Sequence, residues 1–324
     1  MRRREFISLV ANAAVAWPLT APAQPVGRTR KIGILWPGAS PPAPPRMESF
    51  LQGLQESGFV EGKNVIVELR YAEKGLPQLT ELAAELVRLQ VEVIEANGDF
   101  APRVAQQVTS TIPIVALSDD VLGAGLISSL SRPGGNTTGL TIFSPELSAK
   151  RLEVLSEMLP GLSRVAALWD PTTGQSQVAL TENVARALKI KLQVLEVRKR
   201  EELVEAFRVA RSEGAEALNV FSSPFLASLY QEIIALAAKN RLPAIYQWRE
   251  HAEAGGLLSY GPSLAQLWRQ VGTIVAKILK GAKPMEMPVE QPTKFELVVN
   301  ARTAESLGLA IPQSILLRTD HMIQ

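Results

Sequence analysis

The 324-residue chain has no cysteine and only two histidines, His251 and His321. Without cysteine the protein can form no disulfide, thiol nucleophile, zinc finger or cysteine-held iron–sulfur cluster. Neither histidine has a partner at a metal-ligand spacing, so we expect no metal site. The chain also lacks a P-loop, an HExxH motif and a GxSxG motif, and Gly123-Ala124-Gly125 lacks the third glycine of a dinucleotide fingerprint. We therefore expect no bound cofactor and no catalytic residues.

The chain also has no large excess of positive or negative charge. Lys and Arg number 34 against 32 Asp and Glu, so the net charge is +2, which gives no general attraction to nucleic acid. Hydrophobic residues make up 46% and charged residues 20%, as in ordinary globular proteins, and the length favours two domains. Beyond the N-terminus no apolar run approaches the ~18 residues that indicate a membrane-spanning helix.

The N-terminus has the features of an export signal. Three arginines precede an apolar run over residues 8–19, and Ala21-Pro22-Ala23 forms an Ala-X-Ala cleavage site. The segment 3–7, Arg-Arg-Glu-Phe-Ile, is similar to the twin-arginine signature. We expect residues 1–23 to be a twin-arginine-type signal peptide, which places the protein in the periplasm of a Gram-negative bacterium; a basic start on an ordinary helix is the alternative.

Strand and helix patterns alternate along the chain in two similar passes. Short apolar runs predict strands, and helical periodicity lies between them. The predicted strands are 31–36, 65–69, 91–96, 112–117, 165–169, 192–197, 217–221 and 243–246. Such alternation predicts an α/β protein with two parallel sheets. After residue 255 a strand, a helix over 264–279, a proline-rich stretch, a strand over 295–299 and a short helix break the pattern, which indicates that the chain crosses between the halves more than once.

The loops that follow the strands are the expected ligand site, because open parallel sheets bind ligands at their carboxyl ends. Glycine and serine there offer N–H donors to a carboxylate, Asp120 suits an ammonium group, and aromatic rings suit cations or apolar groups. This combination fits an amino-acid-like ligand. The same residue types also serve in turns and helix caps, so each position has this simpler interpretation. The candidate ligand-binding residues in these loops are Trp36, Gly38, Asn97, Gly98, Ser118, Asp120, Asp170, Thr172, Ser222, Ser223 and Tyr246.

Two longer motifs connect the chain to a known family. Residues 132–139 read Arg-Pro-Gly-Gly-Asn-Thr-Thr-Gly, and residues 253–261 read Glu-Ala-Gly-Gly-Leu-Leu-Ser-Tyr-Gly. With 32–38 and 112–117, they make the chain resemble the substrate-binding proteins of ABC transporters that have the type I periplasmic-binding fold, in the family that includes aromatic amino-acid binders. The resemblance implies that Asp120, Ser222 and Tyr260 face the ligand. The loops at 97–99 and 119–121 depart from the family's usual Gly/Thr-rich and Gly-Asp-Pro patterns.

The resemblance also implies an architecture. We expect two doubly wound, Rossmann-like lobes joined by a three-crossing hinge, with the ligand cleft between them. Lobe I should comprise residues 30–140 and 262–283, and lobe II residues 141–261 and 284–318. The crossings should lie near 139–142, 259–261 and 284–288.

The expected function follows from this architecture. A monomeric periplasmic protein would capture an amino acid or related carboxylate, aromatic or branched, by hinge closure and deliver it to an ABC permease in the inner membrane. No nucleic acid partner is expected. A ligand-sensing receptor domain coupled to a signalling partner is the main alternative. A periplasmic enzyme that uses Asp119 or Asp120 as acid and base is the third.

Overall fold

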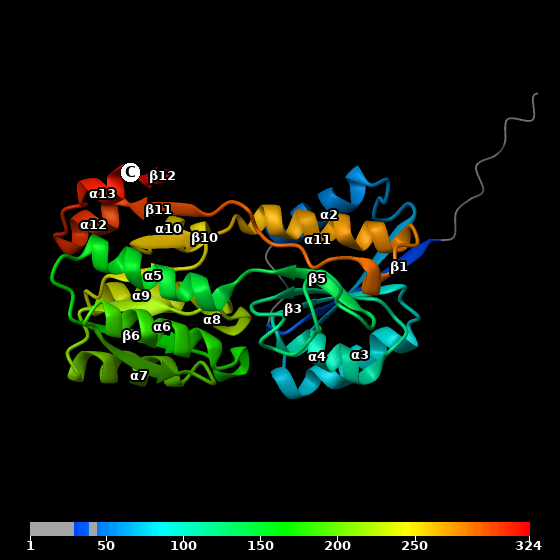
Figure 1. Cartoon of the computed structure of the whole chain (residues 1–324), viewed down its shortest axis with the longest axis horizontal. Helices are drawn as coiled ribbons and strands as arrows, with labels where there is room; N and C mark the ends of the chain where they lie inside the picture. The colour runs from blue at the N-terminus through cyan, green and yellow to red at the C-terminus, as the bar shows by residue number, and fades with distance from the viewer. Residues whose placement is uncertain (1–28, 39–43) are drawn as a thin grey trace, which may run out of the picture.

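A computed structural model describes residues 29–38 and 44–324, so the expected signal peptide, residues 1–23, lies outside the described residues. The described chain forms two α/β lobes that lie side by side (Figure 1). The first lobe contains a five-stranded sheet with the order β2-β1-β3-β4-β5, in which every neighbouring pair is parallel. Its strands are β1 (Arg30–Trp36), β2 (Val65–Tyr71), β3 (Val93–Asn97), β4 (Ile114–Ser118) and β5 (Thr137–Thr141).

Helices cover both faces of this sheet. Figure 1 shows α2 (Pro44–Glu56) and α11 (Leu264–Leu279) on one side and α3 (Leu79–Arg88) and α4 (Phe100–Val108) on the other. The short turn η1 (Leu76–Gln78) directly precedes α3. The α2–α11 layer buries Phe50 and Trp268 against the sheet. Two glycines allow this close crossing: a Cβ on Gly53 would lie 2.0 Å from the Arg269 carbonyl oxygen, and one on Gly272 would lie 2.2 Å from that of Phe50.

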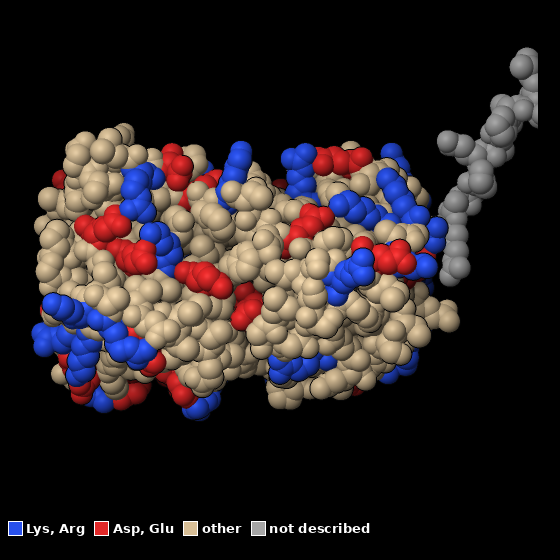
Figure 2. Space-filling view, in the orientation of Figure 1, with Lys and Arg blue, Asp and Glu red and all other residues tan. Residues whose placement is uncertain are grey.

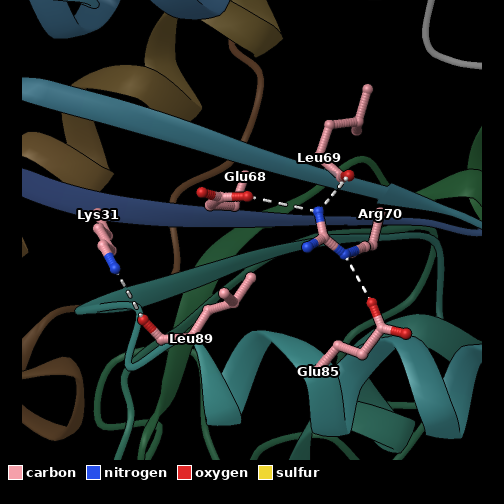
Figure 3. A network of polar contacts seen from close by, with 6 residues as sticks. All are labelled: Lys31, Glu68, Leu69, Arg70, Glu85 and Leu89. Carbon is pink, nitrogen blue, oxygen red and sulfur yellow. Dashed lines mark hydrogen bonds and ion pairs between the residues drawn. The ribbon is translucent and has the colours of Figure 1, made fainter.

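The free edge of the first sheet is tied to the layer beneath it by polar contacts. Arg70 of β2 donates from Nε to Glu85 Oε2 of α3 at 2.8 Å and from Nη1 to the Leu69 carbonyl at 3.0 Å (Figure 3). These side chains are partly exposed, so the ion pair contributes at most about 1 kcal/mol. Their role is local, because none of these three residues lines the hollows between the lobes.

The second lobe contains a seven-stranded sheet with the order β12-β11-β10-β9-β8-β6-β7. Its pairs are parallel except β10–β11, which is antiparallel because the chain returns there from the first lobe. The strands are β6 (Arg164–Trp169), β7 (Lys191–Glu196), β8 (Ala217–Val220), β9 (Ala244–Tyr246), β10 (Leu258–Gly261), β11 (Glu296–Asn300) and β12 (His321–Ile323). Since β12 pairs with β11, this sheet reaches past residue 318, where lobe II was expected to end.

Helices of the second lobe pack on both faces of its sheet and at its ends. They are α5 (Ser144–Met158), η2 (Pro171–Thr173), α6 (Ser176–Ala187), α7 (Glu202–Ser212), α8 (Pro224–Ser228), α9 (Tyr230–Lys239), α10 (Arg249–Glu253), α12 (Ala301–Leu307) and α13 (Gln313–Leu316). On the face in Figure 2, basic and acidic side chains are interspersed over both lobes. None of the helices in the described part of the chain has the length and apolar character needed to traverse a bilayer.

The chain passes between the lobes three times. The first two passages join β5 to α5 and β10 to α11. The third lies later than the 284–288 that the resemblance implies, because residues 284–290 stay with the first lobe. The turn η3 (Pro284–Glu286) packs on β5, Thr138 Oγ1 donates to the Met287 carbonyl at 2.9 Å, and Glu290 forms a bridge with Leu140. The passage is therefore residues 291–295; prolines at 284 and 288 do not prevent their neighbours from pairing with the sheet edge.

A pocket between the lobes as the candidate ligand site

A pocket of about 400 Å³, partly open to solvent, lies between the lobes at the carboxyl ends of both sheets. Strands β1, β3 and β4 lead into it from the first lobe, and β8 and β9 from the second. Helices α2 and α11 complete its wall. The lining residues are Trp36, Arg46, Asn97, Gly98, Leu117, Asp119, Ile142, Ser222, Ser223, Pro224, Ala227, Gln247, Trp248, Leu264 and Trp268.

One wall of the pocket is apolar and rich in tryptophan. The rings of Trp36 and Trp268 are 6.0 Å apart between centroids and inclined at 55°, and Trp248 lines the same pocket from the second lobe. Leu117, Ile142 and Leu264 belong to the lining as well. All three tryptophans are buried, so their faces are held in place by the packing of the lobes. Such a surface fits a flat or bulky apolar side chain.

Arg46 supplies the positive charge of the pocket. It lies in the first turn of α2, with its guanidinium carbon 5.5 Å from the centre of the Trp36 ring, a cation–π geometry. Burial lowers the pKa of Arg46, while the negative charge of Glu250 across the cleft raises it. A guanidinium can bind a carboxylate through two parallel hydrogen bonds, so Arg46 can hold the acidic group of a ligand.

Asp119 is the buried carboxylate of the pocket, and it joins the two lobes. Its Oδ1 accepts a hydrogen bond from Ser144 Oγ of α5 at 2.7 Å and another from Ser222 Oγ at the end of β8. Burial raises the pKa of Asp119, while the hydrogen bonds from Ser222 and Ser144 oppose the rise. Because Ser144 and Ser222 belong to the second lobe, the position of this carboxylate depends on how the lobes meet.

Further contacts show that the lobes are closed on one another. Ser176 Oγ of α6 donates to Asp120 Oδ2 at 3.0 Å. Gly98, with φ of +70°, lies against Pro224 of the other lobe; a Cβ on Gly98 would approach Pro224 Cγ to 2.8 Å. This contact separates the tryptophan-lined pocket from a second hollow of about 310 Å³, which Asp99, Asp170 and Thr172 help to line.

Asp99 fixes the loop that carries Asp119. Its Oδ1 accepts from Ser118 Oγ at 2.6 Å, from the Asp119 N–H at 3.0 Å and from the Asp120 N–H at 3.2 Å. Burial, with the nearby charge of Asp119, raises the pKa of Asp99 to about 7. The carboxyl thus organises the backbone from inside the first lobe. Among the described residues, no group of three or more acidic or histidine side chains could hold a metal ion.

The structure brings five of the predicted residues to this pocket: Trp36, Asn97, Gly98, Ser222 and Ser223. Asp170 and Thr172 line the second hollow instead. Asp170 is engaged there as an acceptor for Ser223 Oγ at 2.6 Å. Their contact with a ligand stays a prediction.

The other predicted residues lie away from the pocket lining. Gly38 packs under the Trp36 indole, Ser118 is bonded to Asp99, and Asp120 contacts Ser176. Tyr246 is buried inside the second lobe, with its ring 5.7 Å from that of His251. Tyr260 lies in β10 and stacks on Phe295, the last residue of the third passage between the lobes, at 6.2 Å between ring centres.

Several lining residues were missed by sequence reasoning. Asp119 lines the pocket where its neighbour Asp120 was expected. Gln247 and Trp248 directly follow β9, in a loop that the strand-end rule includes, but of this loop only Tyr246 was chosen as a candidate. Arg46 and Trp268 come from the sides of helices α2 and α11, and no local pattern marks them. Leu117, Ile142, Leu264, Pro224 and Ala227 look like ordinary core residues in the sequence.

The family follows from a comparison with known proteins. The family model for ABC transporter substrate binding proteins matches residues 31–323, nearly all of the described chain. The chain belongs to this family. A two-lobed α/β fold with a pocket at the carboxyl ends of both sheets agrees with the resemblance seen in its motifs.

Individual relatives of this substrate-binding protein are distant in sequence. A tyrosine-binding protein of Clostridioides difficile is 22% identical over 286 residues, which cover 87% of this chain and 82% of the relative. A conserved domain protein of Vibrio cholerae superimposes with a TM-score of 0.83 at 25% identity, over 91% of this chain and all of that one. An ABC domain from Streptococcus pneumonia in complex with L-Trp gives 0.81 at 22% identity, with the same coverage.

Proposed function

We propose that this substrate-binding protein is the periplasmic receptor of an ABC importer and that its ligand is an α-amino acid with a large apolar, preferably aromatic, side chain. The observation that carries the proposal is the composition of one pocket. Three buried tryptophans, one arginine and one buried carboxylate line the same pocket between the lobes. An aromatic amino acid has one group that matches each of these.

Each part of an amino-acid ligand has a chemical partner among the residues that line the pocket. The ligand carboxylate would bind Arg46, the pocket's cation, with hydroxyls of Ser222 and Ser223 nearby. Its ammonium group would bind Asp119. The side chain would lie among Trp36, Trp248 and Trp268, where burial of an aromatic ring contributes about 25 cal/mol per Å² of apolar surface.

The relatives support this ligand class. One is described as tyrosine-binding, and another was solved with L-Trp. Both ligands are aromatic amino acids, and the tryptophan-lined wall suits either ring. Of the aromatic residues that the sequence places near the strand ends, Trp36 and Trp248 line the pocket, while Tyr246 and Tyr260 lie elsewhere.

Transport would use the closure of the lobes. The inter-lobe contacts of Asp119 with Ser222 and of Gly98 with Pro224 describe the closed form, in which a ligand is shielded from water. A ligand that binds both lobes stabilises this form relative to the open one. The closed monomer, exported by the signal at residues 1–23, would then present a composite surface of both lobes to its permease.

Calorimetry with the purified protein tests the proposal. We expect tyrosine, tryptophan or phenylalanine to bind with a Kd in the micromolar range or below. Small-angle scattering should show a smaller radius of gyration on binding, and the ligand should be recovered unchanged. Failure of every amino acid in the panel to bind would contradict the proposal, and chemical turnover of the ligand would favour the enzyme alternative.

A further inference from the structure

A fully buried glutamate lies in the middle of β3, just behind the pocket. Glu95 has no exposed surface and is flanked along the strand by Val93, Ile94 and Ala96. One of its oxygens, Oε1, accepts a hydrogen bond from Asn97 Nδ2 at 2.6 Å. The other, Oε2, has no hydrogen-bond partner among the described residues. A carboxyl group in such a place costs stability, since burial of a polar group is only partly compensated by one hydrogen bond.

The carboxyl of Glu95 is neutral under ordinary conditions. Burial raises its pKa to about 8, and the hydrogen bond from Asn97 opposes this rise only in part. At pH 7 the carbonyl oxygen of the neutral acid is therefore the atom that accepts from Asn97. A glutamine at this position would keep this acceptor, which provides a nearly isosteric control.

In this structure the hydrogen bond turns the nitrogen of the Asn97 amide towards Glu95. Asn97 lines the pocket, and its amide has one acceptor oxygen and one NH₂ donor that exchange places when the group rotates by half a turn. Because Glu95 engages the nitrogen, the oxygen is left for the pocket. Gln247 lines the same pocket and is buried, and its Oε1 has no partner among the described residues.

We propose that Glu95 is a positioning residue for ligand recognition: by holding the amide nitrogen of Asn97 it presents the Asn97 oxygen to the pocket and makes the pocket prefer a ligand with an ammonium group over the same ligand without it. The inference rests on the proposed function, because it concerns the same site. Asn97, Gln247 and Asp119 together offer acceptors to the three N–H bonds of an ammonium group. A ligand without these donors leaves the acceptors buried and unpaired, and pockets of this kind reject such ligands strongly.

The test compares each ligand with its deaminated analogue. Kd values are measured by calorimetry at pH 7 for tryptophan and indole-3-propionate, and for tyrosine and 3-(4-hydroxyphenyl)propionate. The ratio of the two Kd values in each pair reports the preference for the ammonium group. We expect the wild-type ratio to be at least about 100, and Glu95→Gln to keep it within about threefold.

Glu95→Met removes the acceptor and frees the Asn97 amide. We expect the ratio to fall at least about tenfold, through weaker binding of the amino acid, while the deaminated acid binds as before. If Glu95 had a merely structural role, the variant would bind both ligands more weakly by the same factor, and the ratio of their Kd values would not change. This result would overturn the inference. Asn97→Ala is the second variant, for the case in which Glu95→Met does not fold: an unchanged ratio in Asn97→Ala would overturn the inference equally.

The wild-type measurement separates the two proposals. If the wild type binds the deaminated acid as tightly as the amino acid, the role of Glu95 is refuted, while a receptor for aromatic carboxylates remains. If neither kind of ligand binds, the proposed function fails as well.

Discussion

Gly98 and Pro224 touch across the cleft, one from each lobe. A Cβ on Gly98 would lie 2.8 Å from Pro224 Cγ, closer than real Cβ atoms approach their neighbours. Gly98 also has φ of +70°, a conformation that residues with a Cβ adopt at a cost. The closed form thus depends on the absence of a side chain at this position.

Gly98→Ala should therefore oppose closure. We expect ligand affinity to fall about tenfold or more and the ligand-free protein to scatter as a more open particle. Gly125→Ala is the matched control, because Gly125 has φ of +68° but nothing within 4 Å of the added atom. It should lose about 1 kcal/mol of stability from backbone strain and keep its affinity. Equal affinities for the two variants would show that the Gly98–Pro224 contact does not control closure.

Arg46→Ala should reduce the affinity for ligands that have a carboxylate and leave the affinity for ligands without one unchanged. Loss of a charge-assisted hydrogen bond of about 1.5–3 kcal/mol predicts a 10- to 150-fold weaker Kd for tryptophan. Tryptamine, which has no carboxylate, should bind the variant and the wild type alike in calorimetry. Arg249→Ala is the control, since Arg249 is exposed, pairs with Glu253 and does not line the pocket. A large loss in Arg249→Ala with none in Arg46→Ala would place the carboxylate elsewhere.

Glu95 should make the protein less stable as the pH rises. Its pKa is 4.5 in the exposed state and about 8 in the folded protein, so between these values the folded form holds a proton that the unfolded form has lost. The free energy of unfolding therefore falls over this range, by up to about 1.4 kcal/mol per pH unit. Glu95→Gln removes this contribution, so its stability relative to the wild type should increase from pH 5 to pH 8. Urea unfolding of both proteins at several pH values measures this, and parallel curves would refute it.

Gly272→Ala should destabilise the first lobe. The new Cβ would lie 2.2 Å from the Phe50 carbonyl oxygen, a backbone atom that cannot move without shifting α2. Overpacking of this kind costs about 1–3 kcal/mol, of which the better helix propensity of alanine offsets up to about 1. Thermal unfolding should show a lower midpoint, whereas Gln266→Ala on the exposed side of the same helix should leave it nearly unchanged.

Prediction from sequence succeeded where a pattern was local. The helix over 264–279 was predicted with the bounds that α11 has, because its apolar residues recur on one face and Ser263 caps its start. Helix α5 was missed, because polar and apolar residues alike are buried along it; Arg151 and Ser148 lie inside, where Arg151 Nη2 donates to Ser148 Oγ at 2.7 Å. Such a helix shows little amphipathic periodicity.

The candidate site divides in the same way. Trp36, Asn97 and Ser222 were found because they follow strands whose carboxyl ends face a common space. Arg46 and Trp268 could not be found, because α2 and α11 meet at the pocket only through the packing of segments distant in the sequence. Asp120 was chosen as the ligand-binding carboxylate, but Asp119 is the one that lines the pocket. Side chains of neighbouring residues point to opposite sides of the chain, and the sequence pattern does not say which side faces the cleft.

The position of α11 has a consequence for synthesis of the chain on the ribosome. This helix covers one face of the first sheet, and its Trp268 and Val271 complete the core there, yet it is translated after β6 to β10 of the second lobe. The second sheet is complete only when β11 and β12 have been added, and these strands are translated after α11. Neither lobe has all its parts until translation nears the C-terminus, so the nascent chain carries two half-covered sheets, and C-terminal truncation before α11 damages both lobes at once.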